Sequence, residues 1–126
     1  MDEATRRRRH FRNRPRSGRQ AGVSWHVVVD GAAAGEERTA HTRDISVGGA
    51  FIVTDEPEPR GTRLRVTLHL AERAITVDAE VRWLADEDEP ARGMGVRFHG
   101  LSVEQAQEIN RFQSSFIETV DHDDLA

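Results

Sequence analysis

Hydrophobic and polar residues alternate along several short segments of the chain, which is the pattern of a strand with one buried face. The alternation is clear over residues 23–29, 64–70, 75–83 and 94–98. Residues 39–53 hold two more strand-like runs, and the pair Gly48-Gly49 between them is interpreted as a kink that marks a bulge or a close approach of another backbone segment. The pattern therefore predicts about six short strands and a mainly β fold.

Turn-forming residues separate these segments. Aspartate, glycine and proline cluster at residues 30–35, which are predicted to be a turn or loop, and at residues 56–61 and 86–92, which are predicted to be loops. The connection over residues 71–74 is short, so the strands before and after it are expected to form an antiparallel hairpin.

The C-terminal segment carries a helical pattern instead. Ser102 and Gln105 have the spacing of a capping box, in which each side chain bonds the backbone of the other at a helix start. An apolar stripe follows at near-helical spacing, made of Ala106, Ile109, Phe112, Phe116 and Val120. Strands and helix together predict a small antiparallel barrel or sandwich that is capped by a C-terminal helix.

Charge is distributed unevenly along the chain. Residues 1–20 hold eight arginines and two acidic residues, whereas the remainder holds ten arginines and twenty acidic residues. The basic segment lacks periodicity, and a block of like charge repels itself until a partner neutralises it. The expected layout is a flexible arginine-rich arm over residues 1–22, a folded domain over residues 23–120 and an acidic tail over residues 121–126.

Several classes of function lack support in the sequence. The chain has no cysteine, no apolar run of the roughly 20 residues that span a bilayer and no apolar segment after its basic N-terminus. It is therefore expected in the cytoplasm, without membrane insertion. The histidines lack paired metal spacing, no phosphate-binding loop motif occurs and Ser46 has no nearby histidine. These features favour a binding module without metal or cofactor over an enzyme.

Trp25 and Trp83 are expected in the core, although Trp83 at a strand end could border a pocket.

The arm contains two Arg-x-x-x-Arg pairs, Arg8 with Arg12 and Arg12 with Arg16. Guanidinium groups bind phosphate oxygens and the O6/N7 edge of guanine through paired hydrogen bonds. Such an arm suits an anionic ligand.

A second local feature complements the arm. Asp44 and Ser46 stand two residues apart in an extended segment, so their side chains point to the same face, and Gly48-Gly49 add no side chain to it. The carboxylate can accept hydrogen bonds from N1 and N2 of guanine or from an arginine, and the hydroxyl can reach a phosphate. Glycines let a flat base approach the backbone. Arm and strand together suit a guanine nucleotide better than a sugar, a lipid or a metal.

These segments carry a family resemblance. Arg12-Asn13-Arg14-Pro15-Arg16, followed by Asp44-Ile45-Ser46-Val47-Gly48-Gly49, resembles the signature of the PilZ domain family, Arg-x-x-x-Arg and then Asp/Asn-x-Ser-x-x-Gly. Residues 93–98, with the sequence Gly-Met-Gly-Val-Arg-Phe, resemble the last core strand of that family. The resemblance implies a small six-stranded antiparallel PilZ-type β-barrel with a C-terminal α-helix, which binds cyclic di-GMP and folds its arm over the ligand.

Carried over residue by residue, the resemblance assigns ligand binding to Arg12, Arg16, Asp44, Ser46 and Gly49, with Arg8, Arg9 and Gly48 as further candidates. Residues 17–22 separate Arg16 from the first strand, a longer gap than is usual in the family. The shorter gap favours the Arg12/Arg16 register over Arg8/Arg12, and both registers stay open.

The resulting hypothesis is a cyclic di-GMP receptor domain that orders its arm on the ligand and signals through a protein partner. One alternative is a PilZ-like adaptor that binds proteins without a nucleotide, and the retained motif residues count against it. The other is a nonspecific nucleic-acid binder that uses the basic arm. The acidic body counts against nucleic acid, as does an arm whose stacking residues are His10 and Phe11 alone.

Overall fold

The structure is a computed structural model that describes residues 20–71, 73–86, 88 and 90–125, with side chains up to Ser114. Its elements are β1 Gly22–Val29, β2 Ala32–Ser46, β3 Gly49–Val53, β4 Arg63–Leu70, β5 Arg73–Leu84, β6 Gly93–His99 and α2 Val103–Leu125. The helix continues through residues 121–125, which the sequence pattern assigns to an acidic tail.

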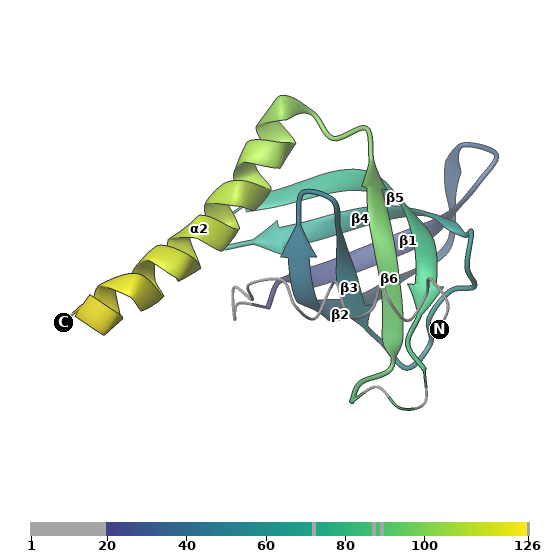
Figure 1. Cartoon of the computed structure of the whole chain (residues 1–126). Helices are drawn as coiled ribbons and strands as arrows, with labels where there is room; N and C mark the ends of the chain where they lie inside the picture. Colours follow the sequence, from purple (N-terminus) through teal and green to yellow (C-terminus); the bar gives the residue numbers. More distant parts are fainter. Residues whose placement is uncertain (1–19, 72, 87, 89, 126) are drawn as a thin grey trace.

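The strands form one closed ring of antiparallel neighbours in the order β1-β2-β3-β6-β5-β4, and β4 pairs with β1 to close it (Figure 1). The predicted mainly β fold, with six antiparallel strands and a C-terminal helix, is confirmed. The hairpin predicted across residues 71–74 is formed by β4 and β5. The last strand, β6, inserts between β3 and β5, and this places residues 93–99 beside the motif-bearing hairpin.

The interior of the ring is filled by apolar side chains from all of the strands. Trp25 belongs to this core, as predicted, and is 1% exposed. The helix α2 packs against β2 and β4, and its Ile109 and Phe112 are buried in the same cluster. The other predicted stripe residues Phe116 and Val120 lie outside the described side chains. Among the residues that the structure describes, no helix has the length and hydrophobicity to cross a membrane.

Hydrogen bonds fix the start of α2 and attach it to the ring. The predicted capping box is present: the Ser102 N–H donates to Gln105 Oε1 and the Gln105 N–H donates to Ser102 Oγ, each at 3.0 Å. Gln105 Nε2 donates to the Thr76 carbonyl of β5 at 2.8 Å. Gln113 Nε2 donates to the Ile45 carbonyl of β2 at 2.6 Å. One of the two attachments is therefore on the strand that carries the predicted ligand motif.

Two predicted irregular segments differ from expectation. The turn or loop expected over residues 30–35 is a turn that is shorter than expected: Asp30 and Gly31 alone connect β1 and β2, with φ angles of 52° and 81°, the left-handed conformation that tight hairpin turns require. The pair Gly48-Gly49 is not a kink within one strand. Val47 and Gly48 form the turn of the β2–β3 hairpin, and Gly49 begins β3 in register with Ser46.

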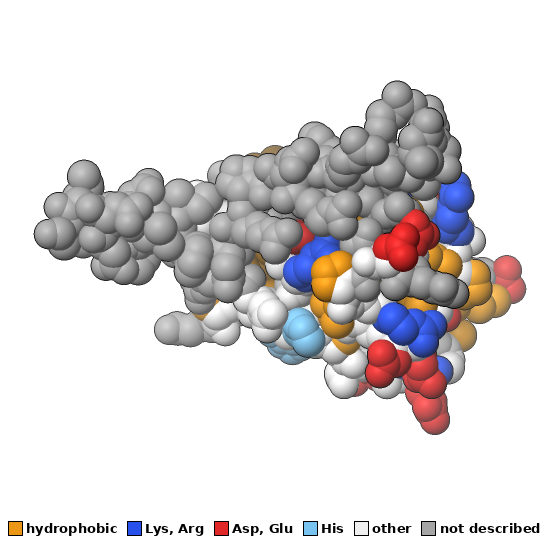
Figure 2. All heavy atoms as spheres, turned by 60° about the horizontal axis from the view of Figure 1, so that its bottom comes forward, with side chains coloured by type: hydrophobic (Ala, Val, Ile, Leu, Met, Phe, Trp, Pro, Cys, Tyr) orange, Lys and Arg blue, Asp and Glu red, His pale blue; other side chains and the backbone are white. Residues whose placement is uncertain are grey.

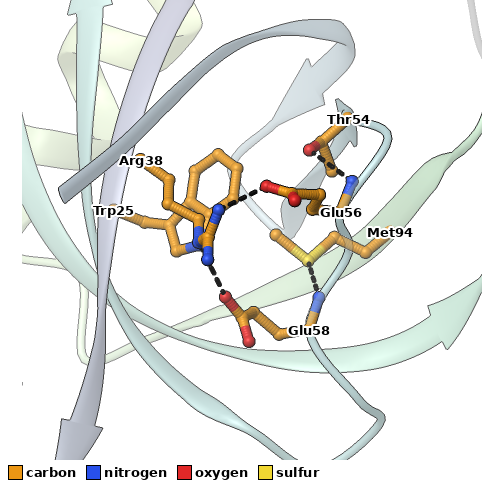
Figure 3. Close-up of polar contacts among 6 residues, drawn as sticks. All are labelled: Trp25, Arg38, Thr54, Glu56, Glu58 and Met94. Atoms are coloured by element: carbon orange, nitrogen blue, oxygen red, sulfur yellow. Dashed lines mark hydrogen bonds and ion pairs between the residues drawn. The ribbon is translucent and has the colours of Figure 1, made fainter. Parts of the chain in front are cut away.

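The long loop between β3 and β4 is tied to the ring by a polar cluster (Figure 3). Arg38 of β2 forms ion pairs with Glu56 and Glu58 of this loop. Glu58 also accepts a 3.4 Å hydrogen bond from Trp25 Nε1, and its N–H donates to Met94 Sδ at 3.3 Å. The indole N–H of the core tryptophan thereby has a partner, and two carboxylates of the loop are already engaged.

Candidate ligand-binding site

The predicted strand motif forms a tight hairpin at the outer surface of the ring. Asp44 and Ser46 flank Ile45, whose side chain belongs to the core. Because side chains alternate along a strand, Asp44 and Ser46 share the outer face. The Gly48 N–H donates to Ser46 Oγ at 3.2 Å, so the serine hydroxyl also closes the turn.

Gly48 and Gly49 differ in what surrounds them. A Cβ atom at position 49 would lie 2.1 Å from the Val96 carbonyl oxygen and 3.2 Å from Arg97 Cα, so the backbone of β6 occupies the place of a side chain. Among the residues that the structure describes, a Cβ atom at position 48 would meet only Ser46 Oγ, at 3.8 Å. Close packing of β3 on β6 thus requires a glycine at 49, whereas Gly48 is exposed and leaves open space beside Ser46.

A row of four residues crosses the sheet beside the motif. Asp44 of β2 pairs with Phe51 of β3, Phe51 with Gly95 of β6, and Gly95 with Trp83 of β5. Phe51 alternates with core residues, so the row lies on the outer face. A Cβ atom at Gly95 would overlap the Trp83 indole, which shows that the indole covers this glycine. The rings of Trp83 and Phe51 are therefore able to stack, with centroids 5.1 Å apart.

Two irregularities in the strands direct the ends of this row outward. Register shifts fall between Thr42 and Asp44 of β2 and between Val81 and Trp83 of β5. Each shift adds one residue to its strand, which moves the following side chain to the opposite face. Trp83 is buried, as predicted, and is 3% exposed, but it packs against Phe51 on the outer face and does not belong to the cluster inside the ring.

Arg43 connects the carboxylate of this row with its aromatic rings. Arg43 Nε donates to Asp44 Oδ2 at 2.9 Å, and the guanidinium carbon lies 4.1 Å from the centroid of the Phe51 ring. Both ion-paired side chains are largely buried, at 16% and 8% exposed, where water screens their attraction weakly. The pair orients the Asp44 carboxylate, and a carboxylate retains acceptor capacity for further donors.

The described part of the arm joins the ring next to the motif strand. The Ala21 N–H donates to Thr42 Oγ1 at 3.1 Å, and the Thr42 N–H donates to the Ala21 carbonyl at 2.9 Å. Both residues are buried, and Thr42 precedes Asp44 by two positions. The predicted arginine ligands lie outside the described residues, namely Arg8, Arg9, Arg12 and Arg16.

Sequence reasoning did not include Arg43 or Phe51 in the site. Both residues stand inside or next to the strand motif, but their proximity depends on the strand register, which no local pattern reveals. Within the part of the chain that the structure describes, no group of three or more histidine, aspartate or glutamate side chains is arranged to hold a metal ion.

The closed antiparallel sheet, the terminal helix and the outward Asp-x-Ser-x-x-Gly hairpin define a fold of the PilZ type. The family model of the PilZ domain matches residues 6–114, and the chain belongs to this family. The match includes the arginine pairs of the arm as well as the strand motif.

Solved structures show the same fold. MrkH of K. pneumonia has a TM-score of 0.66 and 18% identity, with 86% of this chain and 49% of that chain covered. The Bacillus subtilis inhibitor of motility MotI/DgrA has a TM-score of 0.64 and 21% identity, with coverage of 78% and 47%. The PilZ domain of Escherichia coli YcgR, solved with c-di-GMP, has a TM-score of 0.58 and 14% identity, with coverage of 82% and 86%. The chain spans about half the length of the first two proteins. A search of curated proteins finds no match.

Proposed function

We propose that this chain is a cyclic di-GMP receptor domain, in which the arginine arm and the Asp44/Ser46 hairpin bind the ligand together. The observation that carries the proposal is the pair of hydrogen bonds between Ala21 and Thr42, which anchors the end of the arm beside the motif strand. Membership in the PilZ family supports it, as does the structural similarity to a PilZ domain solved with c-di-GMP.

Chain length allows the arm to reach the motif. Arg16 lies five positions before the anchored Ala21, and an extended chain of that length spans at most about 17 Å. Arg12 lies nine positions before Ala21 and reaches about 30 Å at most. Both candidate arginines can therefore approach Asp44, and the five residues between Arg16 and β1 form no obstacle to the Arg12/Arg16 register.

The chemistry of the described half of the site fits a guanine nucleotide. Asp44 offers a carboxylate that Arg43 already orients, and it can accept from N1 and N2 of guanine. Ser46 lies on the same face and can donate its hydroxyl hydrogen to a phosphate while its oxygen accepts from Gly48. Arginines of the arm supply the positive charge that this acidic body lacks. In this role the domain is a regulatory binding module that works without chemical turnover.

Calorimetric titration of cyclic di-GMP into the purified protein tests the proposal, with Arg16→Ala as the variant and GTP as the control ligand. We expect micromolar or tighter binding by the wild type, at least about tenfold weaker binding by Arg16→Ala and none of GTP. If Arg16→Ala binds as well as the wild type while Arg8→Ala does not, the Arg8/Arg12 register is correct. Absence of binding by the wild-type protein would refute the receptor proposal.

The helix α2 is a suitable output element for a protein partner. Ile45 lies between Asp44 and Ser46, and its carbonyl accepts the 2.6 Å hydrogen bond from Gln113. A shift of the motif strand on ligand binding would therefore be transmitted to the helix.

Gln113→Glu and Gln105→Glu are matched variants for this link, because each replaces an amide donor by a carboxylate of the same shape. Gln113→Glu is expected to abolish the ligand-induced change in hydrogen-exchange protection of α2, since it removes the bond to Ile45. Gln105→Glu removes a bond to Thr76 on β5 but keeps the capping box, and should retain the response. Identical responses of the two variants would contradict the link.

Two other functions would be indicated by different binding results. A protein that binds its partner without nucleotide would be an adaptor, and Asp44 would then be needed for partner binding alone. Nucleic-acid binding through the arm would survive Asp44→Ala and ignore cyclic di-GMP. The face in Figure 2 disfavours nucleic acid, because acidic side chains lie among the basic ones on the described surface.

A further inference from the structure

Arg97 of β6 faces the motif hairpin from the far side. The register pairs Ser46 with Gly49 and Gly49 with Arg97, so these three residues form a second row across the outer face. Arg97 stands between Val96 and Phe98, whose side chains belong to the core, and it is exposed. Its side chain therefore projects from the same face as Ser46.

The guanidinium of Arg97 is not used by the fold. Glu80 stands directly opposite Arg97 on β5, but its carboxylate lies 3.3 Å from His99 Nε2 instead. Among the residues that the structure describes, Arg97 has no carboxylate within ion-pair distance. An arginine that is exposed, without such a partner and next to a ligand motif is available to bind a ligand.

The space between Ser46 and Arg97 suits a purine. The two residues stand two strand spacings apart, which is about 9.5 Å between backbones. Gly49 lies between them and carries no side chain, and backbone atoms of Val96 and Arg97 occupy the position of its missing Cβ atom, so the surface between Ser46 and Arg97 consists of backbone. In guanine the N1 and N2 donors and the N7 acceptor lie on opposite sides of the base. A guanine held by Asp44 through N1 and N2 can present its O6/N7 edge to β6.

We propose that Arg97 binds the O6/N7 edge of the guanine that Asp44 holds, and thereby selects guanine over adenine. The inference rests on the proposed function and adds a residue outside both sequence motifs. Arginine donates two parallel hydrogen bonds to O6 and N7 of guanine, whereas adenine presents a donor in place of O6. Asp44 would bind the N1/N2 edge of the base and Arg97 its O6/N7 edge.

The test compares wild type and Arg97→Ala by calorimetry, with cyclic di-GMP and its 7-deazaguanine analogue as the two ligands. We expect Arg97→Ala to weaken cyclic di-GMP binding about tenfold, in line with loss of a charged hydrogen-bonding group. The analogue lacks the N7 acceptor, so the change in ligand should weaken binding more for the wild type than for Arg97→Ala. Arg63→Ala is the matched control, because Arg63 continues the same row beyond Glu80 and should leave affinity unchanged.

Three results would contradict the proposed role of Arg97. If the variant loses affinity equally for both ligands, Arg97 contacts a phosphate and the base-reading proposal is wrong. If the variant binds cyclic di-GMP as the wild type does, Arg97 is not a ligand at all, although the receptor function stands. A wild-type protein that binds neither ligand overturns the receptor function and this inference with it.

Discussion

Alanine at position 49 is expected to lower the free energy of unfolding by about 3 kcal/mol or more, whereas alanine at position 48 should change it by about 0.5 kcal/mol or less. The methyl group at 49 would lie 2.1 Å from the carbonyl oxygen of Val96 and 3.1 Å from its carbonyl carbon. These are backbone atoms and cannot rotate away as a flexible side chain can. Relief of the overlap would require β3 to separate from β6, which would also displace the motif hairpin.

Urea unfolding of the wild type, Gly48→Ala and Gly49→Ala measures this difference, with tryptophan fluorescence as the signal. Both variants add the same methyl group to adjacent glycines, so the pair separates the steric overlap from the loss of backbone freedom in the unfolded chain. The fluorescence reports on the core and on the outer face together, because Trp25 and Trp83 occupy these two places. Equal stabilities of the two variants would contradict the close approach of β6 to Gly49.

Asparagine at position 44 is expected to weaken cyclic di-GMP binding about tenfold, because a hydrogen bond to a charged group contributes about 1.5–3 kcal/mol and asparagine keeps one of the two acceptor oxygens. The substitution keeps the shape of the side chain but replaces one acceptor oxygen by a donor NH2 group. That group cannot accept from N1 or N2 of guanine, nor from Arg43, whose Nε lies 2.9 Å from Asp44 Oδ2. Loss of the negative charge also removes the attraction to arginines of the arm.

Asp78→Asn provides the control for this measurement. Asp78 is an exposed carboxylate of β5 that pairs with Arg65 at 3.4 Å, and its substitution removes the same charge from the same domain. It should leave the affinity for cyclic di-GMP unchanged. Thermal unfolding of both variants should accompany the titration, because Asp44 is buried and Asp78 is not. Wild-type affinity in Asp44→Asn would remove Asp44 from the site.

The two strand irregularities give the site its shape. If β2 alternated regularly from Thr42, the Asp44 carboxylate would point into the core as Thr42 does. If β5 alternated regularly from Val81, the Trp83 indole would enter the interior that Val81 faces, and Phe51 would lose its stacking partner. Bulges beside binding sites commonly redirect side chains in this way. They place a carboxylate and an aromatic surface on one outer face, at opposite ends of the row through Gly95.

Much of the fold followed from local sequence. Alternation predicted the strands, and the spacing of Ser102 and Gln105 predicted the start of α2, where both bonds of the capping box are present. These features depend on neighbours within a few residues, which is why a single sequence reveals them. The predicted turns were less accurate, since Asp30-Gly31 and Val47-Gly48 each reverse the chain in two residues.

The sequence by itself determined the strand segments, the shared face of Asp44 and Ser46 and the resemblance that family membership confirms. Only the tertiary structure decided that β6 lies beside β3, that Gly49 has no room for a side chain and that Trp83 faces outward. It also decided that Arg97 stands across Gly49 from Ser46. The physical reason is that side chains alternate between two faces along a strand, so one inserted residue reverses the face of every later side chain. Hydrogen bonds between strands that are distant in sequence decide where in the strand such an insertion lies.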